Sequence, residues 1–324
     1  MEETMKFAEA GKILECVTGS HAYGFARPDS DMDIRGITIP PLDYIMGMYH
    51  FDQQTYPGED KVIYNLKKFM ELAADCNPNI IELLFMPRQH IRFIDKHGEM
   101  LLDNRMLFLS KKARFTFSGY AIAQLKRIKR HKRWIDNPPA QPNPEDFVQT
   151  VHKVLKEKDG HGMPTRCSQD YWDSFTGPKW TEQGVASEYE AQLKDYEHYL
   201  KWKRERNPAR AELEEKHGYD TKHAVHLVRL MRMAGEILRR QGVLVDRKEA
   251  GDAEELIAIR NGAMTYEALI EWADAEDASM EEAYEQSPLQ KAPDRDKINT
   301  LFMDIVFERF GIILKPRVYC RVED

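Results

Sequence analysis

Two short apolar runs near the N-terminus have the pattern of β-strands. The first covers Ile13–Thr18, and a Gly-Ser pair that is typical of a tight turn follows it. A polar loop leads from this turn to a second run, which opens with Asp31, Met32 and Asp33. Because alternate side chains of a strand share one face, we expect Asp31 and Asp33 to project together and Met32 to point into a core.

The pattern after the second strand predicts two more strands and a long series of helices. Strands are expected over 59–66 and 91–94, and apolar residues recur at helical spacing from Leu66 to Ala74. Further helices are expected over 80–85, 111–134, 187–206, 222–240, 253–261, 265–279 and 296–310.

This order of elements predicts two domains. Strands and helices mix over residues 1–110, which is typical of an α/β domain, whereas residues 111–324 are mainly α-helical. The Pro- and Asn-rich run DNPPAQPNP begins a loop-rich excursion at about 136–186 inside the helical domain. A chain of 324 residues is long enough for two such cores.

Composition narrows the class of protein. The formal net charge is −7, which argues against a protein that coats nucleic acid non-specifically. The four cysteines are scattered without CxxC spacing, which argues against a zinc knuckle and against a disulfide framework. No signal peptide and no apolar run near twenty residues is present, so we expect a cytoplasmic protein that does not enter a membrane.

The first turn and the second strand carry the candidate chemistry. Asp31 and Asp33 would repel each other on one face of a strand unless a cation lies between them. Magnesium is the expected cation, because hard divalent ions prefer oxygen ligands. Gly19 has no Cβ to block an approaching phosphate, and Ser20 adds a hydroxyl to the backbone N–H groups of the turn. These parts predict a phosphate site beside a metal site.

The motif GS-x10-DMD, with apolar strands on both sides, resembles the signature of the DNA polymerase beta-type nucleotidyltransferase superfamily. Three further stretches, LKKFMELAADCNPNIIELLF, SDMDIRG and GYDTKHAVHLVRLM, resemble the RNA-repair-pathway nucleotidyltransferases of bacteria and large phages. The resemblance implies a polymerase beta-like domain with a mixed sheet, followed by an α-helical C-terminal domain. It also implies transfer of an NMP from an NTP to a hydroxyl group by two metal ions, with Mg²⁺ or Mn²⁺ as cofactor and ATP as the expected NTP.

Enzymes of this superfamily need a third carboxylate on a neighbouring strand. Asp60 is our candidate, because it lies at the entry of the predicted strand over 59–66, and Glu59 is the alternative. The resemblance implies that Asp31, Asp33 and Asp60 are both the catalytic residues and the metal ligands.

Several residues are candidate ligands of the triphosphate. Lys222, His226 and Arg229 fall on one stripe of a helix and suit phosphate binding, although an ordinary surface with salt bridges to Glu214 and Glu215 has the same pattern. Arg35 is in phase with the aspartates and either contacts a phosphate or pairs with Asp31 or Asp33 when metal is absent. The full candidate set is Gly19, Ser20, Arg27, Arg35, Lys67, Lys222, His226 and Arg229.

The segment Lys111–Arg133 is basic and holds no acidic residue, so it is a candidate path for the backbone of an RNA acceptor. A solvated basic helix face has the same composition. We therefore expect an RNA acceptor first and a protein or small-molecule acceptor second. A module that binds nucleotide or RNA without catalysis is the third hypothesis.

Overall fold

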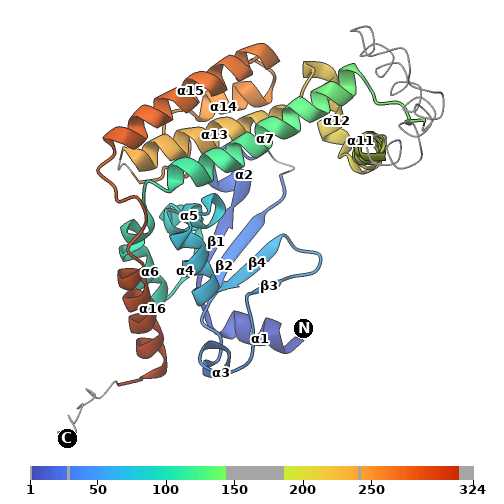
Figure 1. Cartoon of the computed structure of the whole chain (residues 1–324). Helices are drawn as coiled ribbons and strands as arrows, with labels where there is room; N and C mark the ends of the chain where they lie inside the picture. The colour runs from blue at the N-terminus through green and yellow to red at the C-terminus, as the bar shows by residue number, and fades with distance from the viewer. Residues whose placement is uncertain (1, 28–29, 144–185, 240–241, 314–324) are drawn as a thin grey trace, which may run out of the picture. The chain divides into compact units, whose positions relative to one another are not determined.

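The structure of the chain is a computed structural model, and it describes residues 2–27, 30–143, 186–239 and 242–313 (Figure 1). The chain divides into two compact units, one of residues 1–127 with 221–324 and the other of residues 128–220. The first unit therefore joins the N-terminal sheet to the C-terminal helices, and this division differs from the boundary that the sequence suggests after residue 110. Most of the expected excursion at 136–186 lies outside the described residues.

The core of the first unit is a five-stranded mixed sheet with the order β3-β4-β2-β1-β5. Strands β2 and β4 are parallel, and the other neighbouring pairs are antiparallel. The fold class expected from the sequence is thus confirmed. The strands are β1 (Lys12–Thr18), β2 (Asp33–Thr38), β3 (Gln53–Thr55), β4 (Lys61–Asn65) and β5 (Ile91–Ile94).

The second strand begins later than its sequence pattern suggests. Thr18 and Asp33 form the last pair of the β1–β2 ladder, so Asp31 and Met32 precede the paired residues. Without a partner strand at this point, Met32 is 51% exposed, and the prediction that it points into a core was wrong. Ile37 and Ile63, inside the ladders, are fully buried as apolar strand residues should be.

Helices pack around this sheet. Helix α4 contacts β2 and β4, α6 contacts β1 and β5, and α16 contacts both α4 and α6 (Figure 1). Asn65 and Asn77 cap α4 and α5 by accepting hydrogen bonds from backbone N–H groups of their first turns. The helices are α1 (Glu2–Ala10), α4 (Leu66–Ala74), α5 (Pro78–Leu84), α6 (Lys96–Asp103) and α16 (Arg295–Phe310).

A second group of helices in the same unit centres on α13 (Thr221–Leu238). It contacts α14 (Ala253–Arg260) and α15 (Tyr266–Gln286) and is buried on most of its circumference. Helix α7 (Ala113–Asp136) begins in this unit and continues into the other one. The short elements are α2 (Gly19–Ala22), α3 (Leu42–Ile45) and the 3-10 turns η1 (Arg88–His90) and η2 (Arg105–Phe108).

The unit of residues 128–220 holds the end of α7 with α11 (Ala186–Glu205) and α12 (Pro208–His217). Trp134 of α7 packs against Tyr199 and Trp202 of α11, with ring centroids 6.0 and 5.4 Å apart. These rings of α11 therefore pack against another helix. No helix in the described ranges is long and apolar enough to cross a bilayer.

Candidate functional site

The Gly-Ser turn lies directly against the second strand. Strand β1 ends at Thr18, and Gly19 turns the chain into α2 with a φ of +67°, a conformation that favours glycine. A Cβ at Gly19 would lie 2.0 Å from Oδ2 of Asp33. The hydroxyl of Thr18 also donates to the backbone carbonyl of Asp33 over 3.3 Å. Ser20 follows in α2 and is half-buried. Only glycine lets the Asp33 carboxylate approach the turn this closely.

Asp33 and Asp60 lie side by side because β2 and β4 are parallel. The register pairs Ile34 with Lys61, so the preceding residues, Asp33 and Asp60, are neighbours, and the N–H of Ile34 donates to the carbonyl of Asp60 over 2.8 Å. Burial, and then hydrogen bonding and repulsion from Asp60, raises the pKa of Asp33 to about 6. The hydrogen bond from Asp33 and the contact with Arg35 lower the pKa of Asp60. Ionising both carboxyl groups at this separation is unfavourable, and Asp33 is the one whose pKa rises.

Arg35 neutralises part of this acidic pair. Its Nη2 atom is 3.0 Å from Oδ1 of Asp60 and 3.7 Å from Oδ1 of Asp33. Its Nη1 atom donates to the backbone carbonyls of Ile34 and Asp60, each over 2.9 Å. Of the two roles that the sequence leaves open, the structure shows the pairing with carboxylates, and the partners are Asp33 and Asp60.

The remaining predicted residues lie in several different elements of the fold. Asp31 is exposed just before β2. The positive charge of Lys222 at the start of α13 lowers the pKa of Asp33, so this lysine lies within electrostatic range of the pair. Arg27 is exposed and donates to Oδ1 of Asn261 over 3.1 Å. Lys67 is exposed in the first turn of α4.

Arg229 requires a correction. It was predicted to form a phosphate-binding face with Lys222 and His226, but it is only 2% exposed and forms an ion pair with Glu82 of α5. His226 is half-buried, and its Nδ1 lies 3.5 Å from Nη2 of Arg229. A helical wheel shows which residues share a stripe, but it does not show which other element covers that stripe.

Sequence reasoning also missed Glu82 as a partner of Arg229. A signal was present, because Glu82 stands alone inside the apolar run IIELL. A carboxylate in a buried helix face needs a cationic or hydrogen-bonding partner, since burying it alone is very costly. The position of Glu82 therefore predicts a buried cationic partner elsewhere in the chain.

The paired carboxylates fit a divalent cation. Asp33 and Asp60 present oxygen ligands, which suit Mg²⁺ and Mn²⁺. Two features indicate that the site has too much negative charge for its own cations: the pKa of Asp33 is raised to about 6, and the guanidinium of Arg35 lies against both side chains. A bound divalent cation would supply the missing positive charge. It would then lower the pKa of Asp33 and free Arg35 from its contact with the two carboxylates.

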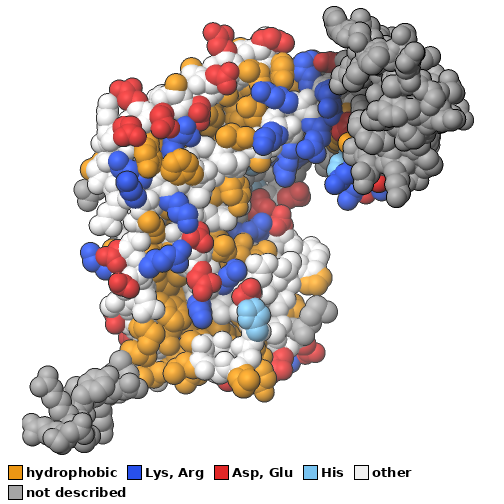
Figure 2. All heavy atoms as spheres, in the orientation of Figure 1, with side chains coloured by type: hydrophobic (Ala, Val, Ile, Leu, Met, Phe, Trp, Pro, Cys, Tyr) orange, Lys and Arg blue, Asp and Glu red, His pale blue; other side chains and the backbone are white. Residues whose placement is uncertain are grey.

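The basic segment Lys111–Arg133 is only partly available to a ligand. Lys112 pairs with Asp75 over 2.7 Å, and Arg114 is buried beside Ser118. Further along α7, four basic side chains are exposed and have no carboxylate partner among the described residues: Lys126, Arg127, Lys129 and Arg130. Figure 2 shows Lys and Arg side chains along this half of α7.

The geometry can now be compared with known proteins. One family model, RlaP, is described as the RNA repair pathway DNA polymerase beta family. Residues 1–137 match this model. The matched range holds the Gly-Ser turn, Asp33 and Asp60, and it confirms the resemblance seen in the sequence. The match covers less than half of the chain's 324 residues and ends near the end of α7.

The chain is also similar to an uncharacterized 38.9 kDa protein in the nrdC-mobD intergenic region of Enterobacteria phage T4. The two are 28% identical over 128 residues, which is 36% of this chain and 38% of the phage protein. The chain thus matches well under two thirds of that relative's length. No solved structure matches the chain.

Proposed function

We propose that this protein is a metal-dependent nucleotidyltransferase that moves an NMP from an NTP, with ATP the expected donor, to a hydroxyl acceptor. The observation that carries this proposal is the contact between the Gly19 turn and the paired carboxylates of Asp33 and Asp60. The match of residues 1–137 to a polymerase beta family supports the same chemistry.

The chain's own groups have distinct roles in this proposal. Asp33 and Asp60, with the exposed Asp31, hold the cations through carboxylate oxygens. Bound Mg²⁺ or Mn²⁺ lowers the pKa of the attacking hydroxyl and neutralises charge on the leaving pyrophosphate. The hydroxyl oxygen forms a bond to the α-phosphorus, the bond from that phosphorus to the pyrophosphate oxygen breaks, and the hydroxyl proton passes to a carboxylate or to water.

In this proposal the phosphates are bound by the Gly19–Ser20 turn and by Lys222. The backbone N–H groups of Gly19 and Ser20 would hold the β- and γ-phosphates, beside the Asp33 carboxylate that the absence of a Cβ at Gly19 admits. We assign Lys222 to the neutralisation of these phosphates, because it is exposed and its charge acts on Asp33. Arg229 has no part in this set, since Glu82 holds it in the interior.

We propose RNA as the acceptor. The family that matches residues 1–137 is described by an RNA repair pathway, and Lys126, Arg127 and Lys129 offer exposed positive charge along α7. Three phosphate contacts of this kind would make RNA binding weaker at high salt. Protein and small-molecule acceptors, and binding without transfer, are the other outcomes of the test.

The test uses an NTP labelled at the α-phosphate, Mg²⁺ and an RNA with a free 3′ hydroxyl. We expect labelled, lengthened RNA, and no product with an RNA whose 3′ end is blocked by phosphate. Label on the protein itself would instead indicate a protein acceptor. Nucleotide binding without transfer to RNA, protein or small hydroxyl compounds would contradict the proposed activity.

A further inference from the structure

Three buried side chains from distant parts of the chain meet behind the Gly-Ser turn. Tyr23 follows α2, Glu82 lies in α5 and Arg229 lies in α13, and their exposed fractions are 7%, 4% and 2%. The hydroxyl of Tyr23 donates to Oε2 of Glu82 over 2.7 Å, and Arg229 pairs with Oε1 of the same carboxylate. The guanidinium carbon of Arg229 lies 3.8 Å from the centroid of the Tyr23 ring.

Tyr23 connects this cluster to the phosphate turn. Its backbone N–H donates to the carbonyl of Gly19 over 3.1 Å, so it closes the single turn of α2. Its own carbonyl accepts from the N–H of Arg247 over 3.2 Å, and Arg247 is itself buried. Burial and the nearby Glu82 carboxylate raise the pKa of Tyr23, and the charge of Asp33 adds to this effect. The Tyr23 hydroxyl therefore lies within electrostatic range of Asp33.

The energetics of the cluster favour a role in placement over a role in net stability. A buried ion pair recovers in attraction about what its two charges lose in hydration, so it adds little stability compared with apolar side chains of the same size. It does require one particular geometry, because any displacement leaves a buried charge unpaired. Glu82 accepts from both Tyr23 and Arg229, and the Tyr23 ring also contacts the guanidinium, so the three side chains hold each other in place.

We propose that Tyr23, Glu82 and Arg229 are positioning residues. They hold the Gly19–Ser20 turn in the position relative to Asp33 that triphosphate binding requires. This inference rests on the proposed function, because it assigns the turn to the phosphates. It also gives α13 a role in that site, although the family match ends at residue 137. The C-terminal helices are then part of the nucleotide site through the packing behind the turn.

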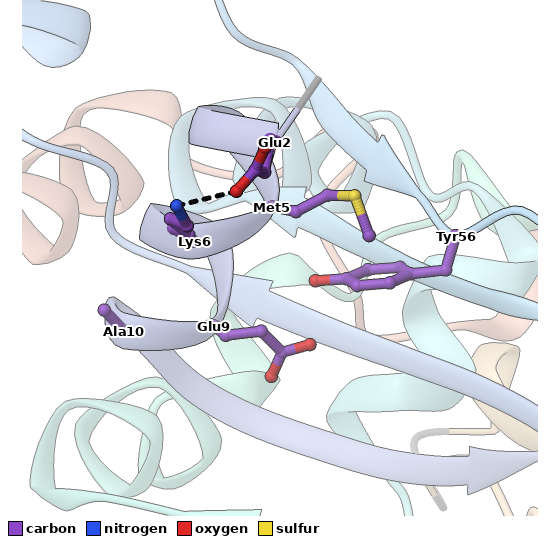
Figure 3. Close-up of a pocket in the computed structure, with 6 residues that line it drawn as sticks. All are labelled: Glu2, Met5, Lys6, Glu9, Ala10 and Tyr56. Carbon is purple, nitrogen blue, oxygen red and sulfur yellow. Dashed lines mark ion pairs between the residues drawn. The ribbon is translucent and has the colours of Figure 1, made fainter.

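The test compares two tyrosine variants of the full-length chain. Tyr23→Phe removes only the hydroxyl that bonds Glu82 and keeps the ring against Arg229. Tyr56→Phe is the matched control, because the Tyr56 hydroxyl lies beside Glu9 at an open pocket next to α1 (Figure 3). Burial, and then the nearby Glu9 carboxylate, raises the pKa of Tyr56. Arg229→Lys is a second test variant, since lysine keeps the charge but loses the planar contact with the ring.

Two readouts separate placement from a general loss of stability. We expect faster hydrogen exchange at the backbone amides of 19–25 in Tyr23→Phe and Arg229→Lys, measured without nucleotide. We also expect the KM for the NTP to rise about five- to twenty-fold with a smaller change in kcat, which corresponds to the loss of one or two buried hydrogen bonds. Tyr56→Phe should leave both readouts unchanged.

Unchanged exchange at 19–25 in both test variants would overturn the inference, and so would an equal effect of Tyr56→Phe. Failure of the proposed function gives a different result. If the unmodified protein transfers no nucleotide but exchange at 19–25 rises in the two test variants, the three residues still position the turn and only the assigned chemistry is wrong.

Discussion

Two groups of carboxylates lie on opposite faces of the same sheet, and their charges are balanced differently. On one face Asp33 and Asp60 both pair with Arg35, and the pKa of Asp33 nevertheless rises to about 6. Glu15 is paired with Gly36 and so points to the other face, where it and Glu9 are held by two lysines. Burial opposes ionisation there too, but hydrogen bonds from Lys61 and Lys12 help to lower the pKa of Glu9 to about 2.

The comparison shows how a structural cluster differs from a candidate site. Glu9 and Glu15 are paired with three cations, Lys12, Lys61 and Arg92, so this group needs no further positive charge. Asp33 and Asp60 with Arg35 retain excess negative charge, and the Gly19 turn approaches within contact of one of them. A protein maintains such an imbalance at a cost in stability, which is typical of functional sites.

The largest effect is expected from neutralising the acidic pair. Asp33→Asn and Asp60→Asn should each lower nucleotidyl transfer by about three orders of magnitude, since metal stabilisation of the transition state is worth several kcal/mol. The matched control on the other face is Glu15→Gln, which should change the rate by less than about twofold. A steady-state transfer assay measures this difference, and equal losses in Asp33→Asn and Glu15→Gln would contradict the comparison.

A smaller effect is expected at the turn. Gly19→Ala places a Cβ against the Asp33 carboxylate and holds alanine at a φ of +67°, so we expect a destabilisation of about 1–2 kcal/mol and a loss of transfer of at least about tenfold. Gly58→Ala is the control, because Gly58 has a φ of +80° and nothing within 4 Å of its added Cβ. If the two variants transferred nucleotide equally well, the contact between turn and carboxylate would have no functional meaning.

The smallest effect is expected on the free energy of unfolding. Its sign should differ between carboxylate variants on the two faces of the sheet. Because folding raises the pKa of Asp33 from 3.8 to about 6, the ionised side chain destabilises the fold, and stability is lost as pH rises through that window. Asp33→Asn should therefore stabilise the metal-free protein at about pH 7.5 by roughly 1 kcal/mol, after allowance for solvent screening, and less near pH 4.5.

Glu9→Gln should have the opposite sign. Folding lowers the pKa of Glu9 from 4.5 to about 2, so its contribution to stability is present above about pH 4.5 and is lost as pH falls toward 2. This variant should lower stability at about pH 7.5. Urea unfolding of both variants at the two pH values measures the effect, and shifts of the same sign at about pH 7.5 would rule out the proposed difference between the faces.

Much of the fold followed from local pattern. The predicted boundaries of helix α4 and strand β5 agree with the structure, because apolar periodicity and flanking turn residues are properties of neighbouring residues. The polar strand β3, with the sequence QQT, carries no such signal and is formed by pairing with β4.

The candidate site could likewise be predicted where it depends on residues close in the chain, but not where it depends on distant ones. The proximity of Gly19 to Asp33 follows from a turn and two adjacent strands, and a sequence motif captures it. The burial of Arg229 depends on Glu82, which is distant in the chain and lies on another helix. Periodicity within one helix contains no information about such a partner, so the predicted phosphate-binding face was wrong at that residue.

The most direct test of the central claim is a calorimetric Mn²⁺ titration of the nucleotide-free protein in buffers of different ionisation enthalpy. Near pH 5, where Asp33 carries its proton, binding at the Asp33 and Asp60 pair should release close to one proton per cation, and near pH 7.5 it should release almost none. Both the binding and the proton release should disappear in Asp33→Asn. Binding that persists in Asp33→Asn, or that releases no proton near pH 5, would contradict the account.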